Sequence, residues 1–360
     1  MAWRTRKILG LAIALALFAW LSVWLGVAVI VPLVEEAQCA GIEFRAGAPG
    51  PKTEPAPRPP IGGSGGLAGK VRSALRGEGA AVHCHDFADP FVLRVGNTYY
   101  AYSTQNQDRH TPVLTSSGLF GTAHTAEALP KLPRWSSAGA VWAPAVLPRP
   151  DGFVLYYATR THDPDRQCLS WAFSNQPGGP FVDDSGGPFV CSADGGAIDP
   201  SPIVDTDGRA YLLWKSDEAT GIVAQELAPD GRSLVGESRT LIRADQGWEA
   251  GVVEAPSMVG YEGRYYLFYS GNDWSTANYA VGYAVCDSPL GPCTKPADGA
   301  LLGSTDKAEG PGGQDVFVDE RGQLWMALHA WVRGKVGYPG GARNLFVVRL
   351  TFVNGAPVVA

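Results

Sequence analysis

Three acidic residues of this 360-residue chain stand beside prolines that recur at a nearly constant interval. Asp89 and Asp199 each directly precede a proline, and Glu254 stands two residues before another. Carboxyl groups that are brought together raise one another's pKa through charge repulsion and burial. One of them then stays protonated while another is ionised, which is the arrangement that acid–base catalysis requires. The alternative is that an acid before a proline only caps a turn.

Each acid opens a repeated unit with the pattern of two strands joined by a tight turn. In residues 198–216 an apolar run leads to the polar turn 205–208, and a second apolar run rich in aromatic residues follows. The turn Asp-Thr-Asp-Gly resembles the start of a calcium loop, but the remaining ligands are missing, so we expect a hairpin turn. The same pattern recurs in residues 89–102, 143–157, 255–269 and 313–328.

The interval between the units predicts the fold. The prolines stand at positions 90, 144, 200 and 256, spaced by 54, 56 and 56 residues, and Gln314 takes the corresponding place 58 residues later. A fixed period of all-β units is typical of a propeller. We therefore predict an all-β, five-bladed β-propeller over residues 80–360. The first strand of each unit lines the axis, so the three acids should meet at one mouth of the channel.

Composition and charge narrow the class of function. Apolar residues make up 45% and charged residues 18% of the chain, which suits a large folded core. The formal net charge is -6, made up of +4 in residues 1–75 and -10 in the rest. An acidic propeller is a poor partner for nucleic acid. Trp248, Trp274 and Trp331 fit blade packing and sugar platforms equally well.

The N-terminal part precedes the propeller as two segments. Arg4, Arg6 and Lys7 come before an uncharged apolar run over residues 8–34 that is long enough to cross a bilayer, and two glutamates follow. We predict a signal anchor over residues 1–34, with the N-terminus inside, in preference to a cleaved signal peptide. Residues 35–79 are rich in Pro and Gly and are predicted to be a flexible linker. The protein is then extracytoplasmic, either anchored in the cell membrane by one span or secreted.

Six cysteines behind an export signal predict disulfides. Cys286 and Cys293 flank a short turn, so we expect them to pair across a hairpin. Cys168 and Cys191 lie in the second repeat and are expected to staple its outer strands. Cys39 and Cys84 remain as a third pair.

Metal-binding motifs are weak in this chain. There is no Cys-x-x-Cys, which argues against a cysteine zinc site. His83 and His85 form an isolated His-x-His pair, for which a metal site is the less favoured interpretation. The sequence predicts no metal ligands.

Several motifs together resemble glycoside hydrolase family 43, and the resemblance covers about residues 83–356 in the family's order. They are HDFADPFVLRVGNTYYAYST, VWAPAVLPRPDGFVLYYA, AIDPSPIVDTDGRAYLLWK, VVEAPSMVGYEGRYYLFYSGN and YAVGYAVCDSPLGPC. The resemblance implies a five-bladed propeller that hydrolyses glycosidic bonds with inversion, on arabinose- or xylose-containing polysaccharides. We expect an arabinan-type substrate.

The resemblance also implies roles for individual residues. Asp89 matches the family's general base, Glu254 its general acid, and Asp199 the acid that orients the proton donor and tunes its pKa. An inverting enzyme needs its acid and base about 6.5–9.5 Å apart, a gap that residues of different blades can supply. Trp142 and Arg343 resemble residues that line the sugar pocket, where arginine donates hydrogen bonds to hydroxyl groups.

One departure from the family concerns the axis of the propeller. Many members carry a histidine in blade five near an axial calcium or water, whereas this chain has Gly-Gly-Gln-Asp at residues 312–315. An axial calcium is therefore in doubt, and we expect no cofactor to be required. Gln314 is expected to line the channel instead and to contact the substrate.

Two other classes of function compete with an enzyme. A non-catalytic propeller that binds carbohydrate at the cell surface is the main alternative, but the complete set of three acids favours catalysis. A protein-interaction propeller of the WD type is disfavoured, because the Trp-Asp signature is missing and the period is about 56 residues rather than about 42.

Overall fold

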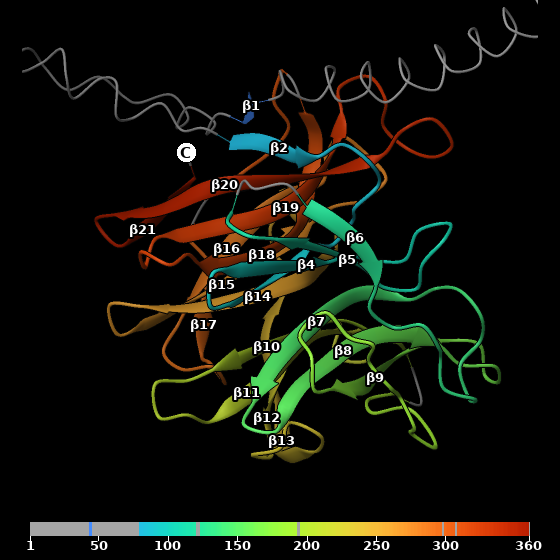
Figure 1. Cartoon of the computed structure of the whole chain (residues 1–360). Helices are drawn as coiled ribbons and strands as arrows, with labels where there is room; N and C mark the ends of the chain where they lie inside the picture. The colour runs from blue at the N-terminus through green and yellow to red at the C-terminus, as the bar shows by residue number, and fades with distance from the viewer. Residues whose placement is uncertain are drawn as a thin grey trace, which may run out of the picture. The chain divides into compact units, whose positions relative to one another are not determined.

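The computed structural model describes residues 43–44, 79–119, 123–192, 195–296, 299–306 and 308–359. Over these residues the chain forms antiparallel sheets arranged as the five blades of a propeller (Figure 1). In blades I to IV the strands follow one another in sequence order. The first strand of each blade contacts the first strands of the blades on either side, so these strands form the inner ring. The predicted all-β, five-bladed fold is confirmed.

The strand bounds follow the repeat closely. Blade I comprises β3 (Phe91–Val95), β4 (Thr98–Tyr102), β5 (Pro112–Ser116) and β6 (Ala123–Glu127). Blade II comprises β7 (Trp142–Arg149), β8 (Gly152–Arg160) and β9 (Gln167–Ser174). Blade III comprises β10 (Ala197–Val204), β11 (Ala210–Ser216), β12 (Gly221–Leu227) and β13 (Leu234–Arg243).

Blade IV comprises β14 (Val253–Tyr261), β15 (Arg264–Gly271), β16 (Ala280–Cys286) and β17 (Cys293–Thr294), preceded by the short 3-10 helix η1 (Gly247–Glu249). Blade V comprises β18 (Ala308–Val318), β19 (Leu324–Val332) and β20 (Arg343–Val353), with β2 (Gly79–His83), β1 (Glu43–Phe44) and β21 (Ala356–Val359) at its outer side.

The tight turns predicted within the repeats join the first two strands of each blade. Residues 205–208 lie in the turn between β10 and β11, where the backbone N–H of Gly208 donates to the carbonyl of Asp205 at 3.0 Å. Gly208 has φ +84, a left-handed conformation that glycine adopts without steric cost. This segment is therefore a hairpin turn, as predicted.

The hydrophobic core lies between the faces of neighbouring blades. One buried cluster joins blades I and II, where Tyr102 packs with Tyr157 and Phe181. Similar clusters join blades II and III, blades III and IV, and blades V and I. Burial of aromatic and aliphatic surface on both faces of each sheet is the main force that holds the blades together.

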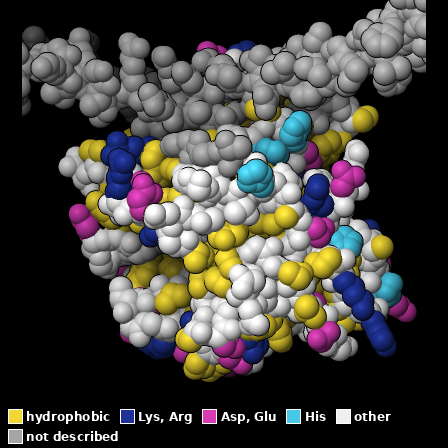
Figure 2. All heavy atoms as spheres, viewed as in Figure 1, with side chains coloured by type: hydrophobic (Ala, Val, Ile, Leu, Met, Phe, Trp, Pro, Cys, Tyr) yellow, Lys and Arg dark blue, Asp and Glu magenta, His cyan; other side chains and the backbone are white. Residues whose placement is uncertain are grey.

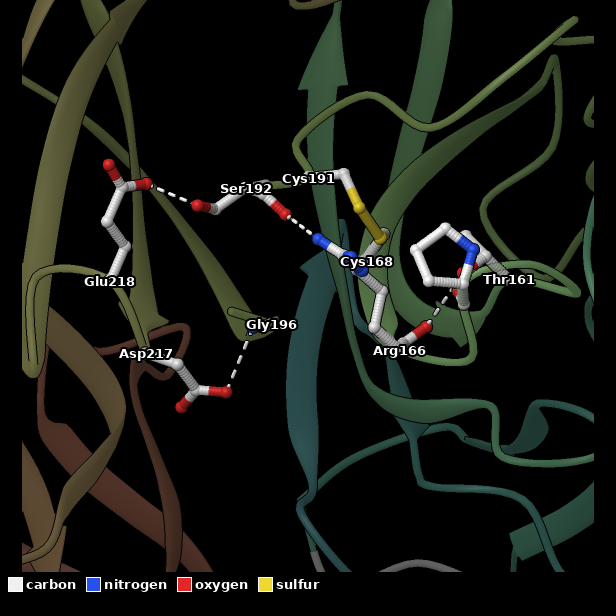
Figure 3. Close-up of a disulfide and its surroundings, with 9 residues drawn as sticks. Thr161, Arg166, Cys168, Cys191, Ser192, Gly196, Asp217 and Glu218 are labelled. Carbon is white, nitrogen blue, oxygen red and sulfur yellow. Dashed lines mark hydrogen bonds between the residues drawn. A yellow bond between two sulfur atoms is a disulfide. The ribbon is translucent and has the colours of Figure 1, made fainter. Parts of the chain in front are cut away.

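Blade II has a disulfide where the other blades have a regular outer strand. Its outer segment pairs with β9 through isolated bridges at Val182 and Val190, and Cys191 is linked to Cys168 of β9. Figure 3 shows that Arg166 donates to the carbonyl oxygen of Ser192 next to this disulfide. The predicted stapling of the second repeat is confirmed.

The other cysteine predictions have different outcomes. Cys286 and Cys293 are linked across the β16–β17 hairpin, as predicted. Cys84 is also disulfide-bonded. The predicted partner, Cys39, lies outside the described residues.

The ring is closed by a strand that precedes blade I in the sequence. β2 pairs with β20, so the outer part of blade V comes from the start of the propeller sequence. Figure 1 shows β2, in light blue, beside β20, in red. This pairing ties the two ends of the repeat array together, which removes an open edge.

The predicted anchor over residues 1–34 and most of the predicted linker lie outside the described residues. Within the described part of the chain, no helix has the length and apolar character needed to span a membrane. On the described face drawn in Figure 2, acidic and basic side chains are interspersed around hydrophobic ones.

Candidate active site

The five repeat starts meet in one pocket at the axis. The residues before the repeated prolines, and the glycine before Gln314, all have left-handed backbone conformations. They are Asp89 (φ 50), Ala143 (φ 43), Asp199 (φ 58), Ala255 (φ 50) and Gly313 (φ 57). All five line a single pocket with about 310 Å³ of empty space. In blades II to V the pairing of the inner strand is also irregular at this point. Non-glycine residues in this conformation are strained, and such strain clusters at functional sites.

Gly313 allows the backbone of blade V to approach the carboxyl group of Asp89 closely. A Cβ added at this position would lie 2.6 Å from Oδ1 of Asp89 and 2.6 Å from the ring of His329. No real Cβ is tolerated so close. Glycine is thus required here by both its left-handed conformation and the close contact.

Asp89 is held as a carboxylate. Its Oδ2 accepts a hydrogen bond of 2.6 Å from Thr104, and its Oδ1 lies 3.8 Å from Nη1 of Arg343. Burial by itself would raise the pKa of Asp89, but the Arg343 charge and the contacts with His329 and Thr104 hold this pKa well below its usual range. Asp89 is therefore ionised at neutral pH, the state in which a carboxyl group can accept a proton.

Asp199 has the opposite environment at the equivalent place in blade III. Its Oδ2 accepts a hydrogen bond of 2.8 Å from the backbone N–H of Ala255. Burial, followed by the negative charges of Glu254 and Asp89, raises the pKa of Asp199. Asp199 therefore retains its proton to a higher pH than an isolated aspartic acid does.

Glu254 does not occupy the place in its repeat that the sequence pattern suggested. The residue of blade IV that corresponds to Asp89 and Asp199 is Ala255, so Glu254 precedes the left-handed position by one residue. Its side chain, which is almost buried, accepts hydrogen bonds at both oxygens. Lys215 donates to Oε2 at 3.0 Å, and Tyr279 donates to Oε1 at 2.9 Å.

A continuous line of contacts joins Glu254 to Asp89. Tyr279 donates to Glu254, and its ring stacks on that of His329, with centroids 5.9 Å apart. Nδ1 of His329 accepts a hydrogen bond of 3.0 Å from the backbone N–H of Asp89. Burial lowers the pKa of His329, which keeps its imidazole neutral. The two acids predicted to do chemistry are thus positioned by a shared buried framework.

The predicted sugar-contacting residues differ in accessibility. Trp142 precedes Ala143 at the pocket and is 38% exposed. Arg343 is largely buried beside Asp89. Gln314 lines the pocket, but its amide accepts from Ser270 at 2.8 Å and donates to the carbonyl oxygen of Ala255 at 2.6 Å. Gln314 therefore already has structural partners.

Comparison with known proteins identifies the family. The model of glycosyl hydrolases family 43 matches residues 81–357. The chain belongs to glycosyl hydrolase family 43. The resemblance found in the sequence motifs is therefore confirmed, and the protein is a glycoside hydrolase; a non-catalytic propeller is not favoured.

The chain is moderately similar to several individual proteins. It is 27% identical over 293 residues to an extracellular endo-α-(1→5)-L-arabinanase of Bacillus subtilis, covering 75% of this chain and 86% of the arabinanase. It is 25% identical over 209 residues to a Xylanibacter ruminicola protein named for β-xylosidase activity, covering 55% of this chain and 38% of that protein. The crystal structure of a thermostable family-43 glycoside hydrolase superposes with a TM-score of 0.69 at 28% identity, covering 76% of this chain and 92% of the other.

The calcium found at the axis of many family-43 members does not fit the residues present here. Asp315 accepts hydrogen bonds from the backbone N–H of Val92 at 2.9 Å and from Ser257 at 3.1 Å, and the Gln314 amide is engaged as described. Within the described ranges, no group of three or more His, Cys, Asp or Glu side chains is placed to hold a metal ion. These axial groups therefore join neighbouring blades through hydrogen bonds.

Several residues of the framework were missed at the sequence level. Lys215, Tyr279 and His329 lie on second strands or on loops, where nothing in the repeat marks them as special. His329 pairs with Gly312 across β18 and β19, a register that only the folded blade reveals. Thr104 and Lys215 each end one of the family-like motifs and Tyr279 begins another, whereas His329 lies in none of them.

Proposed function

We propose that the protein hydrolyses O-glycosidic bonds in arabinose- or xylose-containing polysaccharides, with arabinan as the favoured substrate, and that it inverts the anomeric configuration. The single observation that carries the mechanism is the electrostatic contrast between the acids in one pocket. Asp89 is stabilised as a carboxylate by Arg343, whereas burial and the nearby carboxylates raise the pKa of Asp199. The match along 86% of an endo-arabinanase supports the choice of arabinan.

The roles follow from this contrast. Asp89 takes a proton from a water molecule, whose oxygen attacks the anomeric carbon. Glu254 gives a proton to the glycosidic oxygen as the bond to that carbon breaks, and the released sugar has the opposite anomeric configuration. Asp199 lies next to Glu254 and holds the backbone of Ala255, so it orients the donor and supports its protonation.

Lys215 and Tyr279 hold the carboxyl group of Glu254 in place. Their hydrogen bonds reach one oxygen each, so the group is fixed in orientation before the substrate arrives. The Lys215 ammonium also lies close to Asp199 and opposes the rise in the pKa of that acid.

The roles of the acids are tested with the full chain purified in mild detergent. Hydrolysis of arabinan and arabinoxylan is followed by proton NMR, which reports the anomer formed first. Asp89→Asn and Glu254→Gln should each lower kcat/KM by about 10³-fold. The Glu254→Gln loss should be much smaller on an aryl pentoside with a good leaving group, because that group leaves without protonation.

A matched control comes from the same hairpin as Asp199. Asp207 is an exposed carboxylate in the turn after β10, and Asp207→Asn should leave the activity within about twofold. Retention of the anomeric configuration, or full activity of Glu254→Gln on polysaccharide, would contradict the proposed roles.

We also propose that residues 1–34 anchor the enzyme, so that the propeller acts outside the cytoplasm. The uncharged run over residues 8–34, with basic residues before it and acids after it, supports this. The full chain expressed with a C-terminal tag should remain in the membrane fraction after an alkaline carbonate wash. Release of an N-terminally shortened protein into the medium would favour a cleaved signal instead.

A further inference from the structure

Of the three tryptophans whose roles the sequence left open, one is available to a ligand. Trp331 is fully buried in β19. Trp248 packs against the core between blades III and IV, and its ring stacks on Tyr269 with centroids 5.8 Å apart. Trp274, on the loop between β15 and β16, is 40% exposed. Of these three tryptophans, only Trp274 therefore presents a substantial aromatic surface to solvent.

Trp274 forms part of an exposed aromatic pair. Tyr338, on the loop between β19 and β20, is 49% exposed, and the two ring centroids are 6.3 Å apart. The pair brings together residues from neighbouring blades. Two large aromatic side chains left exposed side by side have an energetic cost in water, which is a common mark of a binding surface.

Trp331 packs against both rings of the pair and fixes their positions. The indole N–H of Trp331 donates to the carbonyl oxygen of Trp274 at 3.1 Å, and its ring stacks on Trp274 at an interplanar angle of 23°. The ring of Tyr338 meets that of Trp331 edge-on, with centroids 5.0 Å apart. A ligand that binds here does not need to order these rings first, which lowers the entropic cost of binding.

Arg343 connects the aromatic pair to the acids. Its guanidinium carbon lies 4.6 Å from the ring centroid of Trp274, its Nε donates to the hydroxyl oxygen of Tyr338 at 3.2 Å, and its Nη1 lies 3.8 Å from Oδ1 of Asp89. A sugar residue seated against Asp89 would therefore have Trp274 and Tyr338 close by. The next residue of the same polymer would reach them.

The charges around the pair favour a neutral ligand. Asp86 accepts hydrogen bonds from the Tyr338 hydroxyl at 2.6 Å and from the backbone N–H of Arg343 at 2.9 Å. The charge of the guanidinium is thus balanced by the nearby carboxylates of Asp89 and Asp86 and is not offered uncompensated to an anion. An uncharged sugar ring, whose C–H face suits an aromatic surface, fits these properties.

We infer that Trp274 and Tyr338 form a platform for a second sugar residue of the polysaccharide, adjacent to the one held at Asp89. This inference rests on the proposed function and adds to it a preference for substrates longer than the cleaved unit. Trp142 is exposed on blade II, whereas the platform comes from the loops of blades IV and V. The substrate therefore extends across the mouth of the pocket.

The platform is tested with arabino-oligosaccharides of two to eight residues and the full chain. In the wild type, kcat/KM should rise with chain length. In Trp274→Ala and Tyr338→Ala this rise should be reduced by about tenfold, chiefly through KM, while Trp274→Phe should restore most of it. Val353→Ala, at an exposed site at the far end of β20, is the control and should keep the wild-type dependence.

Two outcomes would overturn the platform. One is an unchanged dependence on chain length in both alanine variants. The other is an equal loss for all lengths, which would mean that Trp274 acts only by positioning Arg343.

A binding measurement separates the platform from the proposed function. Retardation of the full chain in native gels containing arabinan should be lost in Trp274→Ala and kept in Glu254→Gln. If the wild type hydrolyses no pentose polymer but shows this pattern, the proposed function fails and the platform stands. If retardation is the same in the wild type and Trp274→Ala, the platform fails.

Discussion

The ammonium group of Lys215 on β11 lies 3.0 Å from Oε2 of Glu254 on β14, so a cation from blade III contacts the predicted proton donor of blade IV. The contact is sheltered, since the two side chains are only 23% and 11% exposed. The Tyr279 hydroxyl donates to the other oxygen of Glu254, and Asp199 on β10 lies close to the same carboxyl group. A cation, a hydroxyl group and a second acid thus surround Glu254.

Removal of the Lys215 charge should move the alkaline side of the pH profile. The ammonium group opposes the rise in the pKa of Asp199, so without it this pKa rises further and Asp199, beside the donor, stays protonated to higher pH. We expect Lys215→Met to shift the alkaline limb of kcat/KM upward by about one pH unit. Lys215→Arg keeps the charge and is the control. An unshifted limb in Lys215→Met would show that the ion pair does not govern the donor.

Removal of the Arg343 charge should move the acidic side of the same profile. Arg343 is the principal cause that holds the pKa of Asp89 below its usual range. In Arg343→Met that pKa rises toward the ordinary value of a carboxyl group or above it. Asp89 then becomes protonated, and can no longer act as the base, at a higher pH than in the wild type. The acidic limb of kcat/KM should move upward, and KM should increase because the proposed contact between Arg343 and the sugar is lost. Circular dichroism checks that the variant is folded, and an unmoved acidic limb contradicts the prediction.

The disulfide of blade II should stabilise the fold more than the one in blade IV. Cys168 and Cys191 are 23 residues apart, whereas Cys286 and Cys293 are 7 apart. By loop-closure entropy the first bridge is worth about 3 kcal/mol and the second about 2 kcal/mol. Each pair is replaced by two alanines and the variants are unfolded in urea. The free energy of unfolding should fall more for the Cys168–Cys191 variant than for the Cys286–Cys293 variant. A larger loss for the shorter loop would rule out loop closure as the main contribution.

The buried acid at the axis should make stability depend on pH. Burial raises the pKa of Asp315 to about 7. Because this value lies above that of an unfolded aspartate, the folded state binds the proton more tightly, and the contribution of Asp315 to stability is lost as pH rises from about 4 through about 7. Asp315→Asn cannot ionise, so the free energy of unfolding of the wild type should fall relative to this variant between pH 5 and pH 8. Parallel curves for the two proteins would refute this assignment.

Much of the fold could be predicted from the sequence because a propeller is a local repeat. Each unit places a turn and two apolar runs at fixed offsets, and the constant interval between the prolines then determines the number of blades. The same regularity placed Asp89 and Asp199 at equivalent positions, so their convergence at the axis followed from the period alone. The disulfides at Cys168 and Cys286 lie within single blades, which is why they were also predictable.

Only the tertiary structure decided what surrounds the acids. Lys215, Tyr279 and His329 come from strands or loops of three different blades, and their contacts with Glu254 and Asp89 depend on how neighbouring sheets face one another. The closing pair of β2 and β20 joins segments at opposite ends of the propeller sequence, which no local pattern encodes.

The acids show the same division between sequence and structure. The sequence by itself placed Asp89 and Asp199 at equivalent positions of the repeat, with Glu254 one residue before the equivalent position in blade IV. Their different ionisation was decided by the fold, because a pKa depends on burial and on charges that arrive from other blades. The exposure of Trp274 and the burial of Trp331 were decided in the same way, by loop packing that residue type alone does not specify.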